Sequence, residues 1–137
     1  HDTVVPRHKL PEVLAQVYEI AARHELLVLN VFHAGDGNLH PLLVYDAREP
    51  GVIERVHAAG DEIVRMSVAA GGVLSGEHGI GLEKRDLMPL MFADVDLAAQ
   101  ADLRRAFDPM LLSNPDKVLP SPAKCGDIHS VPEGAWV

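Results

Sequence analysis

The sequence of 137 residues predicts an α+β fold with elements in the order β-α-β-β-α, followed by a small helical C-terminal subdomain. Two observations lead to this prediction. Two segments with helical apolar spacing flank a pair of strand-forming runs that are joined by a glycine-rich turn. Beyond a second glycine-rich stretch the helical segments become shorter, which indicates a separate subdomain. We therefore divide the chain into residues 1–72, 73–120 and a tail of 121–137.

The first strand is expected at Val4-Val5, and the first helix begins near Pro11. Proline is favoured at the first position of a helix, and Glu12 places negative charge in the first turn, where the helix dipole favours it. The apolar stripe of this helix comprises Leu10, Leu14, Val17 and Ala21. The stripe predicts that one face of the helix packs on the core.

A hairpin is predicted from the strand-forming runs Leu26 to Phe32 and Leu42 to Tyr45. The Gly-Asp-Gly-Asn sequence between them supplies the positive φ angles of a tight reversal. We expect His33 and His40 to face each other near the turn, where opposed Cβ atoms lie about 4.5–5.5 Å apart. Pro41 cannot donate to a strand ladder, so it marks an edge or a bulge.

The second helix is expected from about Gly51 to Ala70, and Gly71-Gly72 ends it. Its long apolar stripe is typical of a core-facing helix and comprises Val52, Val56, Ala59, Ile63, Met66 and Ala70. The order of elements up to this point resembles half of a ferredoxin-like sandwich, in which helices cover one face of a sheet.

Two shorter helices are expected at about Leu82 to Met91 and Asp96 to Phe107, the second capped by Asp94 or Asp96. Asn114-Pro115 predicts an extended exit, because the residue before a proline avoids the helical region. From Ser121 onward proline and small polar residues predict a loose tail, with Trp136 either disordered or docked on a neighbour.

A metal site is one interpretation of the hairpin, because two imidazoles on neighbouring strands suit one small cation. The alternative is two independent, hydrogen-bonded side chains. Glu77 lies in the glycine-rich stretch of residues 71–81 and is a candidate third ligand, completing a set suited to Zn, Mn or Fe(II). The adjacent His78 suits a general base. The alternative for this stretch is a connector with an exposed Glu and His.

Three motifs in order carry a family resemblance: HAGDGNLHP at 33–41, GGVLSGEHGIGLEKR at 71–85 and FDPMLLSNPDKVLP at 107–120. They resemble the C-terminal part of FAD-linked oxidases of the vanillyl-alcohol oxidase superfamily, of the glycolate oxidase type, with D-lactate and D-2-hydroxyglutarate dehydrogenases as relatives. The resemblance implies that His33, His40 and Glu77 bind a divalent cation, usually zinc. It also implies that His78 takes the proton of the substrate hydroxyl.

The resemblance further suggests contacts for the cofactor FAD at Asn38, Lys84 and Asn114. Arg7 and Lys9 are assigned to the anionic substrate, to which Lys84 or Arg85 would add positive charge; a solvated surface role is the alternative for these basic residues. Two positions depart from the family pattern and put the local turns in question. Asp116 stands where glycine is usual, and His8 stands where serine is usual.

The implied function is that of the C-terminal, substrate- and metal-binding part of an FAD-dependent 2-hydroxy-acid oxidoreductase. The flavin is expected in another domain, so we expect a fragment that lacks activity alone and works with an FAD-binding domain or oxidase subunits. One alternative is a non-catalytic cap or docking module. Another is a zinc-dependent hydrolase, against which stands the lack of an HExxH helix.

Composition excludes several classes of function. A net charge of −8 argues against a nucleic-acid surface, and no apolar stretch reaches the roughly 18 residues of a membrane helix. The single Cys125 excludes an internal disulfide and fits a reducing compartment. A dinucleotide fingerprint and a calcium loop are both incomplete. We therefore predict a cytoplasmic location, with attachment to the inner face of the membrane through partner subunits left open.

Overall fold

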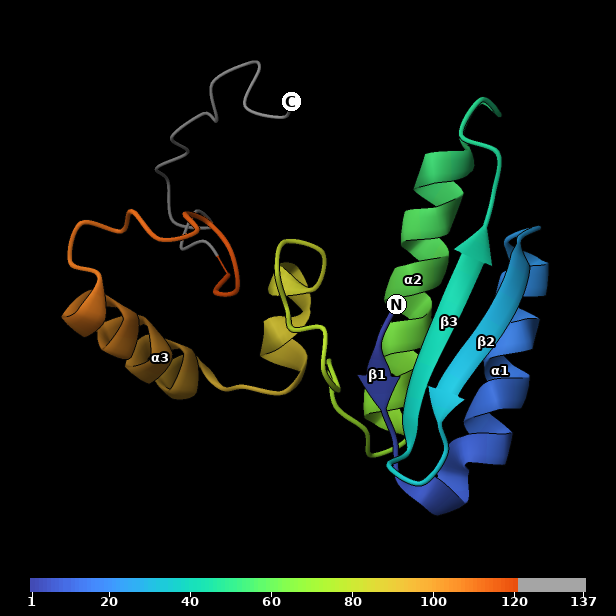
Figure 1. The fold of residues 1–137 in the computed structure, drawn as a ribbon, viewed down its shortest axis with the longest axis horizontal. Coiled ribbons are helices and arrows are strands. Elements are labelled where there is room, and N and C mark those ends of the chain that lie inside the picture. Colours follow the sequence, from blue (N-terminus) through green and yellow to red (C-terminus); the bar gives the residue numbers. More distant parts are fainter. Residues whose placement is uncertain (121–137) are drawn as a thin grey trace.

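The computed structural model describes residues 1–120 and confirms the α+β class (Figure 1). The predicted tail, with Cys125 and Trp136, lies outside the described residues. The strands are β1 (Thr3–Val4), β2 (Leu27–His33) and β3 (Asn38–Val44). The helices are α1 (Leu10–Arg23), α2 (Val52–Ala69) and α3 (Asp94–Phe107), with short 3-10 helices η1 (Arg7–Lys9) and η2 (Arg85–Leu90).

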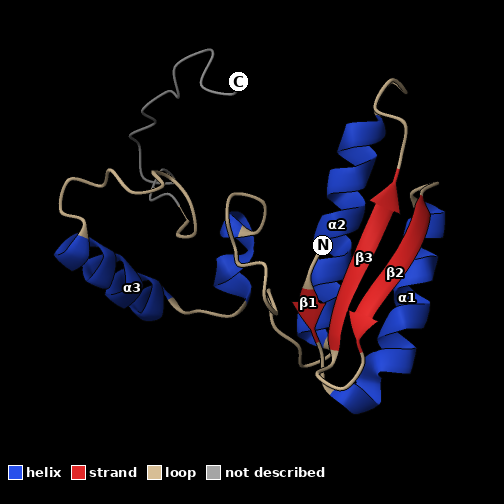
Figure 2. Cartoon of the chain, viewed as in Figure 1, coloured by secondary structure: helices blue, strands red, loops and turns tan. Residues whose placement is uncertain are grey.

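The three strands form one antiparallel sheet in the order β1-β3-β2, and α1 and α2 lie against the same side of it (Figure 2). Both predicted apolar stripes face the core: some of their residues are buried in the main cluster, and the half-buried others pack against it or against a second cluster of Val5, Val13 and Leu39. The main cluster lies between sheet and helices. It comprises Val17, Ile20, Ala21, Leu26, Val28, Val52, Ala59 and Ile63. The other face of the hairpin is open, and the apolar side chains exposed on it are Leu27, Leu29, Val31, Leu42 and Val44.

The hairpin is present, but its register differs from the expected one. His33 pairs with Asn38, and His40 pairs with Val31, so the two histidines lie diagonally rather than directly opposite each other. The reason is that β3 already begins at Asn38, four residues before the predicted run, which leaves residues 34–37 as the turn. Side chains two residues apart on a strand share a face, so both histidines still point to the open side.

Pro41 lies in the central strand, and the β2–β3 register continues unbroken through it, so the described hairpin has no bulge. Along β3, Pro41 follows the two residues, Asn38 and Leu39, that pair with β1. There β3 borders no second strand among the described elements, and the missing N–H is tolerated.

In the helical subdomain the helix predicted at about Asp96 to Phe107 is present as α3, whereas the helix predicted at about Leu82 to Met91 is shortened. Pro89 lies inside η2, a six-residue 3-10 helix, where a longer helix was expected; proline lacks the N–H that an α-helix would use. Helix α3 is capped by Ala93, not by either aspartate, and Asp96 instead accepts the backbone N–H of Ala93 at 3.0 Å. In Figure 1, α3 lies apart from the sheet. No helix of residues 1–120 is long and apolar enough to cross a membrane.

Candidate metal and catalytic site

Glu77 meets both hairpin histidines on the open side of the sheet. Its Oε1 lies 2.9 Å from Nε2 of His40 and 3.3 Å from Nε2 of His33. One ligand atom of each residue lies within 4.8 Å of the others. Two imidazole nitrogens and one carboxylate oxygen are donors that Zn²⁺ and related divalent ions accept. The donor set therefore fits one cation and leaves coordination positions for a substrate.

The hairpin turn places these histidines, and Gly37 is essential to its path. Gly37 has φ +77°, and a Cβ there would lie 2.1 Å from the carbonyl oxygen of Val5. The backbone N–H of Val5 donates to the Gly37 carbonyl at 2.9 Å, which ties the turn to the end of β1. The rings of His33 and His40 then meet edge to face, with centroids 5.3 Å apart.

His78 lies directly beside this set. Its ring stacks on that of His40 at 4.8 Å, with the planes inclined by 12°. Its Nε2 lies 3.8 Å from Oε1 of Glu77. Because 61% of the His78 side chain is exposed, the ring is accessible to a molecule bound at the three candidate ligands.

Asp2 organises the loop that carries Glu77 and His78, although no motif or periodicity in the sequence singles it out. Its Oδ2 accepts the Ser75 hydroxyl at 2.5 Å and the backbone N–H groups of Gly76, Glu77 and His78 at 2.8, 3.1 and 3.0 Å. Burial alone would raise the pKa of the Asp2 carboxyl. The hydrogen bonds from the hydroxyl and the three N–H groups outweigh it and hold that pKa well below its usual range.

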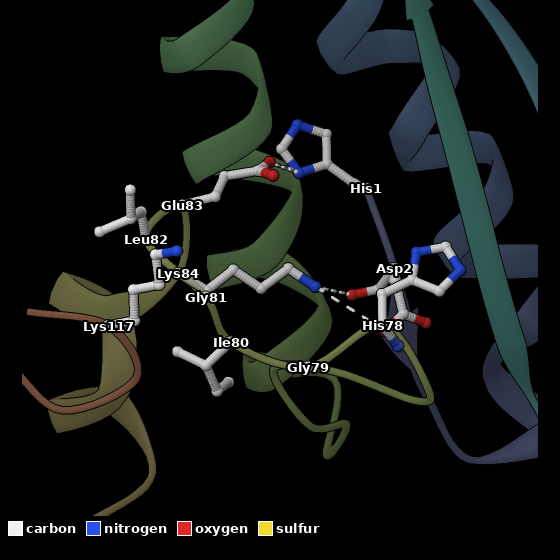
Figure 3. Close-up of a pocket in the computed structure, with 10 residues that line it drawn as sticks. All are labelled: His1, Asp2, His78, Gly79, Ile80, Gly81, Leu82, Glu83, Lys84 and Lys117. Carbon is white, nitrogen blue, oxygen red and sulfur yellow. Dashed lines mark hydrogen bonds and ion pairs between the residues drawn. The ribbon is translucent and has the colours of Figure 1, made fainter. Parts of the chain in front are cut away.

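Lys84 reaches the same aspartate from the far side of the loop (Figure 3). Its Nζ donates to the Asp2 carbonyl and lies 4.0 Å from Oδ2. Burial lowers the pKa of Lys84, whose residue is only 4% exposed, although the charges of Asp2 and Glu83 oppose this. Lys84 lines a cleft of about 460 Å³ together with Asp2, His78 and Lys117. The side chain assigned to the cofactor is thus directed at Asp2.

Asn38 lies within the site region. It is 5% exposed, and its amide group occupies the space that a side chain at position 76 would need, 2.7–2.8 Å from a Cβ built on Gly76. Glycine at 76 therefore lets the loop approach the hairpin closely. Asn38 Oδ1 is buried and has no hydrogen-bond partner among residues 1–120.

Three other predicted residues remain, and of these Arg7 lies close to the hairpin turn, its Cγ 3.7 Å from a Cβ built on Gly37. Arg7 and Lys9 lie in η1, and the Lys9 ammonium binds Glu12 at 2.8 Å. Asn114 lies in the loop after α3, where its carbonyl accepts an N–H of Arg104 at 2.9 Å. Within the described part of the chain, no hydrogen bond or ion pair joins any of the three to the candidate ligands.

The two departures from the family pattern have different local settings. Asp116 adopts φ +59°, the left-handed region that glycine favours and aspartate tolerates better than most residues. Its carbonyl accepts a guanidinium N–H of Arg85 at 2.8 Å. His8 lies exposed in η1.

The open side of this α+β unit carries two histidines and one glutamate, with a further histidine beside them. The three motifs predict a site of this class. The chain belongs to the family described as FAD linked oxidases, C-terminal domain, whose model matches residues 1–118. The resemblance inferred from the motifs is thereby confirmed.

Curated relatives agree with this assignment. Glycolate oxidase subunit GlcD of Escherichia coli K12 is 42% identical over 130 residues, which cover 95% of this chain and 26% of the relative. The Bacillus subtilis subunit GlcD is 34% identical over 90% of the chain and 26% of its own length. A probable mitochondrial D-lactate dehydrogenase of Danio rerio is 33% identical, over 86% of this chain and 24% of its own length. The chain thus spans about a quarter of the length of these relatives.

Proposed function

We propose that this chain is the C-terminal, metal- and substrate-binding part of an FAD-dependent 2-hydroxy-acid oxidoreductase. The observation that supports this most is the meeting of His33, His40 and Glu77 beside the accessible ring of His78. Family membership supplies the redox class. The similar proteins include glycolate oxidase subunits and D-lactate dehydrogenases, and glycolate and D-lactate are both small 2-hydroxy acids.

The three candidate ligands would hold a divalent cation, for which zinc is the expected ion. About half of each of the His33 and Glu77 side chains is exposed, whereas that of His40 is 9% exposed. This gives one anchored donor and two donors that border the open side of the site. A bound cation supplies Lewis-acid chemistry, lowering the pKa of a hydroxyl that coordinates it.

His78 is proposed as the general base for the substrate hydroxyl. Stacking on His40 fixes the plane of its ring, and Nε2 lies close to the Glu77 carboxylate. A base in that position can take the hydroxyl proton of an acid held by its carboxylate and hydroxyl oxygens. FAD supplies the acceptor for the hydride that leaves Cα.

We place the flavin in a part of the protein outside this chain, so the isolated chain is expected to be inactive. The buried Oδ1 of Asn38, which has no hydrogen-bond partner in the described part of the chain, supports a cofactor contact there. The cofactor roles of Lys84 and Asn114, and the substrate roles of Arg7 and Lys9, stay predictions. So do the cytoplasmic location and the partnership with oxidase subunits.

Flavin reduction tests the proposal. The intact protein is mixed anaerobically with glycolate or D-lactate, and the loss of oxidised-flavin absorbance is followed. His78→Ala should slow reduction by roughly 10²–10⁴-fold, the usual contribution of a positioned base. His24→Ala is the matched control, because His24 binds Glu62 at 3.0 Å on the helical side of the molecule. An unchanged rate in His78→Ala would remove the base assignment.

A further inference from the structure

We infer that Asp2 is a positioning residue of this site: one carboxylate oxygen fixes the loop that bears Glu77 and His78, and the other orients the imidazole of His40. The inference rests on the proposed function, since it concerns the same three ligands. Nothing in the family motifs points to it, because Asp2 lies outside all three.

The first half of the inference follows from the loop hydrogen bonds. Three consecutive backbone N–H groups, from residues 76 to 78, converge on Oδ2 of Asp2. Such convergence forms a nest for an anion. The Ser75 hydroxyl donates to the same oxygen and accepts the N–H of Gly79 at 2.8 Å, which closes the turn. The backbone of Glu77 and His78 is therefore held from its inner side, and their side chains are free to meet the hairpin.

The second half follows from two buried atoms that face each other. Oδ1 of Asp2 lies 3.8 Å from Nδ1 of His40, and both atoms lack a hydrogen-bond partner among the described residues. The opposite ring nitrogen, Nε2, is the one that meets Glu77. Histidines that bind metals usually donate their other N–H to a carboxylate or carbonyl. A proton on Nδ1, directed at Asp2, leaves the Nε2 lone pair free for a cation.

The charge of Asp2 is compensated, so the carboxylate can stay ionised where it lies. Asp2 is 1% exposed, and an isolated ion at such a position would be costly. The Lys84 ammonium lies 4.0 Å from Oδ2 and donates to the Asp2 carbonyl. One buried ion pair thus supports both contacts, to the loop and to the histidine.

Asp2→Asn tests the inference, because asparagine keeps the volume but not the charge. In the intact protein, Zn²⁺ affinity is measured by competition with a chromophoric chelator, and the visible spectrum of the Co²⁺-loaded protein reports the coordination. The variant should bind Zn²⁺ about 10–100-fold more weakly, the usual effect of losing a partner of a ligating histidine. Its Co²⁺ bands should also shift.

Thr3→Val is the matched control. It removes the hydrogen bond from the Thr3 hydroxyl to the Val73 carbonyl, 2.9 Å long, which joins the residue next to Asp2 to the start of the same loop without touching the ligands. Its Zn²⁺ affinity should stay within about twofold of the unmodified protein, and its Co²⁺ spectrum should not change. An equal loss of affinity in Thr3→Val would reduce Asp2 to a general structural role and overturn the inference.

His33→Ala separates this inference from the proposed function. If His33→Ala loses Zn²⁺ and Asp2→Asn retains full affinity and an unchanged Co²⁺ spectrum, the role of Asp2 is refuted and the metal site stands. If His33→Ala binds Zn²⁺ like the unmodified protein, the ligand set itself is wrong. Should Asp2→Asn not fold, Ser75→Ala removes one of the four donors to Oδ2 and should weaken Zn²⁺ binding about fivefold; full affinity there would also refute the role of Asp2.

Discussion

Two loops of this chain are each organised by one aspartate, and they differ in burial and in the distance along the chain that they bridge. Asp2 is buried, and its donors lie 73 to 76 residues away. Asp108 lies near the surface after α3 and accepts the N–H groups of Leu112 and Ser113, four and five residues ahead, at 3.0 and 2.8 Å. The same kind of contact forms a local turn at Asp108 but joins two distant segments at Asp2.

The pKa values of the two carboxyls show the difference in surroundings. At Asp108 the backbone hydrogen bonds from Ser113 and Leu112 are the largest influences on the pKa, and they lower it. At Asp2 burial works against the hydrogen bonds, and the hydrogen bonds still prevail. The stability of the fold therefore depends on the buried Asp2 carboxylate and its donors. A surface turn such as that at Asp108 can form or fray without affecting the rest of the fold.

The largest expected effect separates the two aspartates directly. Asp2→Ala removes the acceptor of three backbone N–H groups and leaves the Lys84 charge without its partner. We expect a loss of about 3 kcal/mol or more in the free energy of unfolding, measured with urea. Asp108→Ala should cost much less, because water replaces the carboxylate at its exposed turn. Equal losses in the two variants would contradict the comparison.

A second, smaller effect tests how tightly the hairpin side of the site is built. Gly37→Ala forces alanine into a left-handed conformation and a Cβ against the Val5 carbonyl, so it should cost about 2 kcal/mol or more. Gly35→Ala, two residues earlier in the same turn, meets nothing within 4 Å and should change stability by less than about 0.5 kcal/mol. Thermal unfolding of both variants measures the difference, and comparable shifts in Tm would show that the turn is not constrained at Gly37.

The smallest effect is a pH dependence at the surface loop. The pKa of Asp108 is lower in the folded chain than its value of about 3.9 in an unfolded one, so its contribution to stability is present above that pH. It is lost as the pH falls through the folded pKa. Asp108→Asn should therefore be slightly less stable than the unmodified protein at pH 7, and the gap should close in acid. If the stability difference between the two proteins grew on acidification, the pKa of Asp108 would have to be raised, not lowered, in the folded chain.

The sequence predicted what depends on local periodicity and composition. The stripes of α1 and α2 gave two helices, whose bounds the structure confirms within a few residues. The hairpin was also expected, but Asn38 and Pro41 are poor strand formers, so the start of β3 and the register of the histidines were missed. Pro89 shortened a predicted helix to a 3-10 turn.

Some residues of the candidate site were also predicted from the sequence, and others were not. Motif resemblance named His33, His40, Glu77 and His78, and the fold brings these four together. It also named Asn114, whose carbonyl instead binds Arg104 in the loop after α3, because membership of a motif does not determine proximity. Arg7 lies outside the three motifs but close to the hairpin turn, since its Cγ would lie 3.7 Å from a Cβ on Gly37. Asp2 was missed for the opposite reason. Its partners lie more than 70 residues away, and a single aspartate beside a short strand carries no periodic signal.

The central claim is that His33, His40 and Glu77 bind one divalent cation. Diffraction from zinc-soaked crystals of the intact protein, recorded on both sides of the zinc absorption edge, tests it most directly. We predict one anomalous peak about 2.0–2.2 Å from Nε2 of His33, Nε2 of His40 and Oε1 of Glu77. A zinc peak bound by other residues, or density between these three side chains without anomalous signal, would contradict the account.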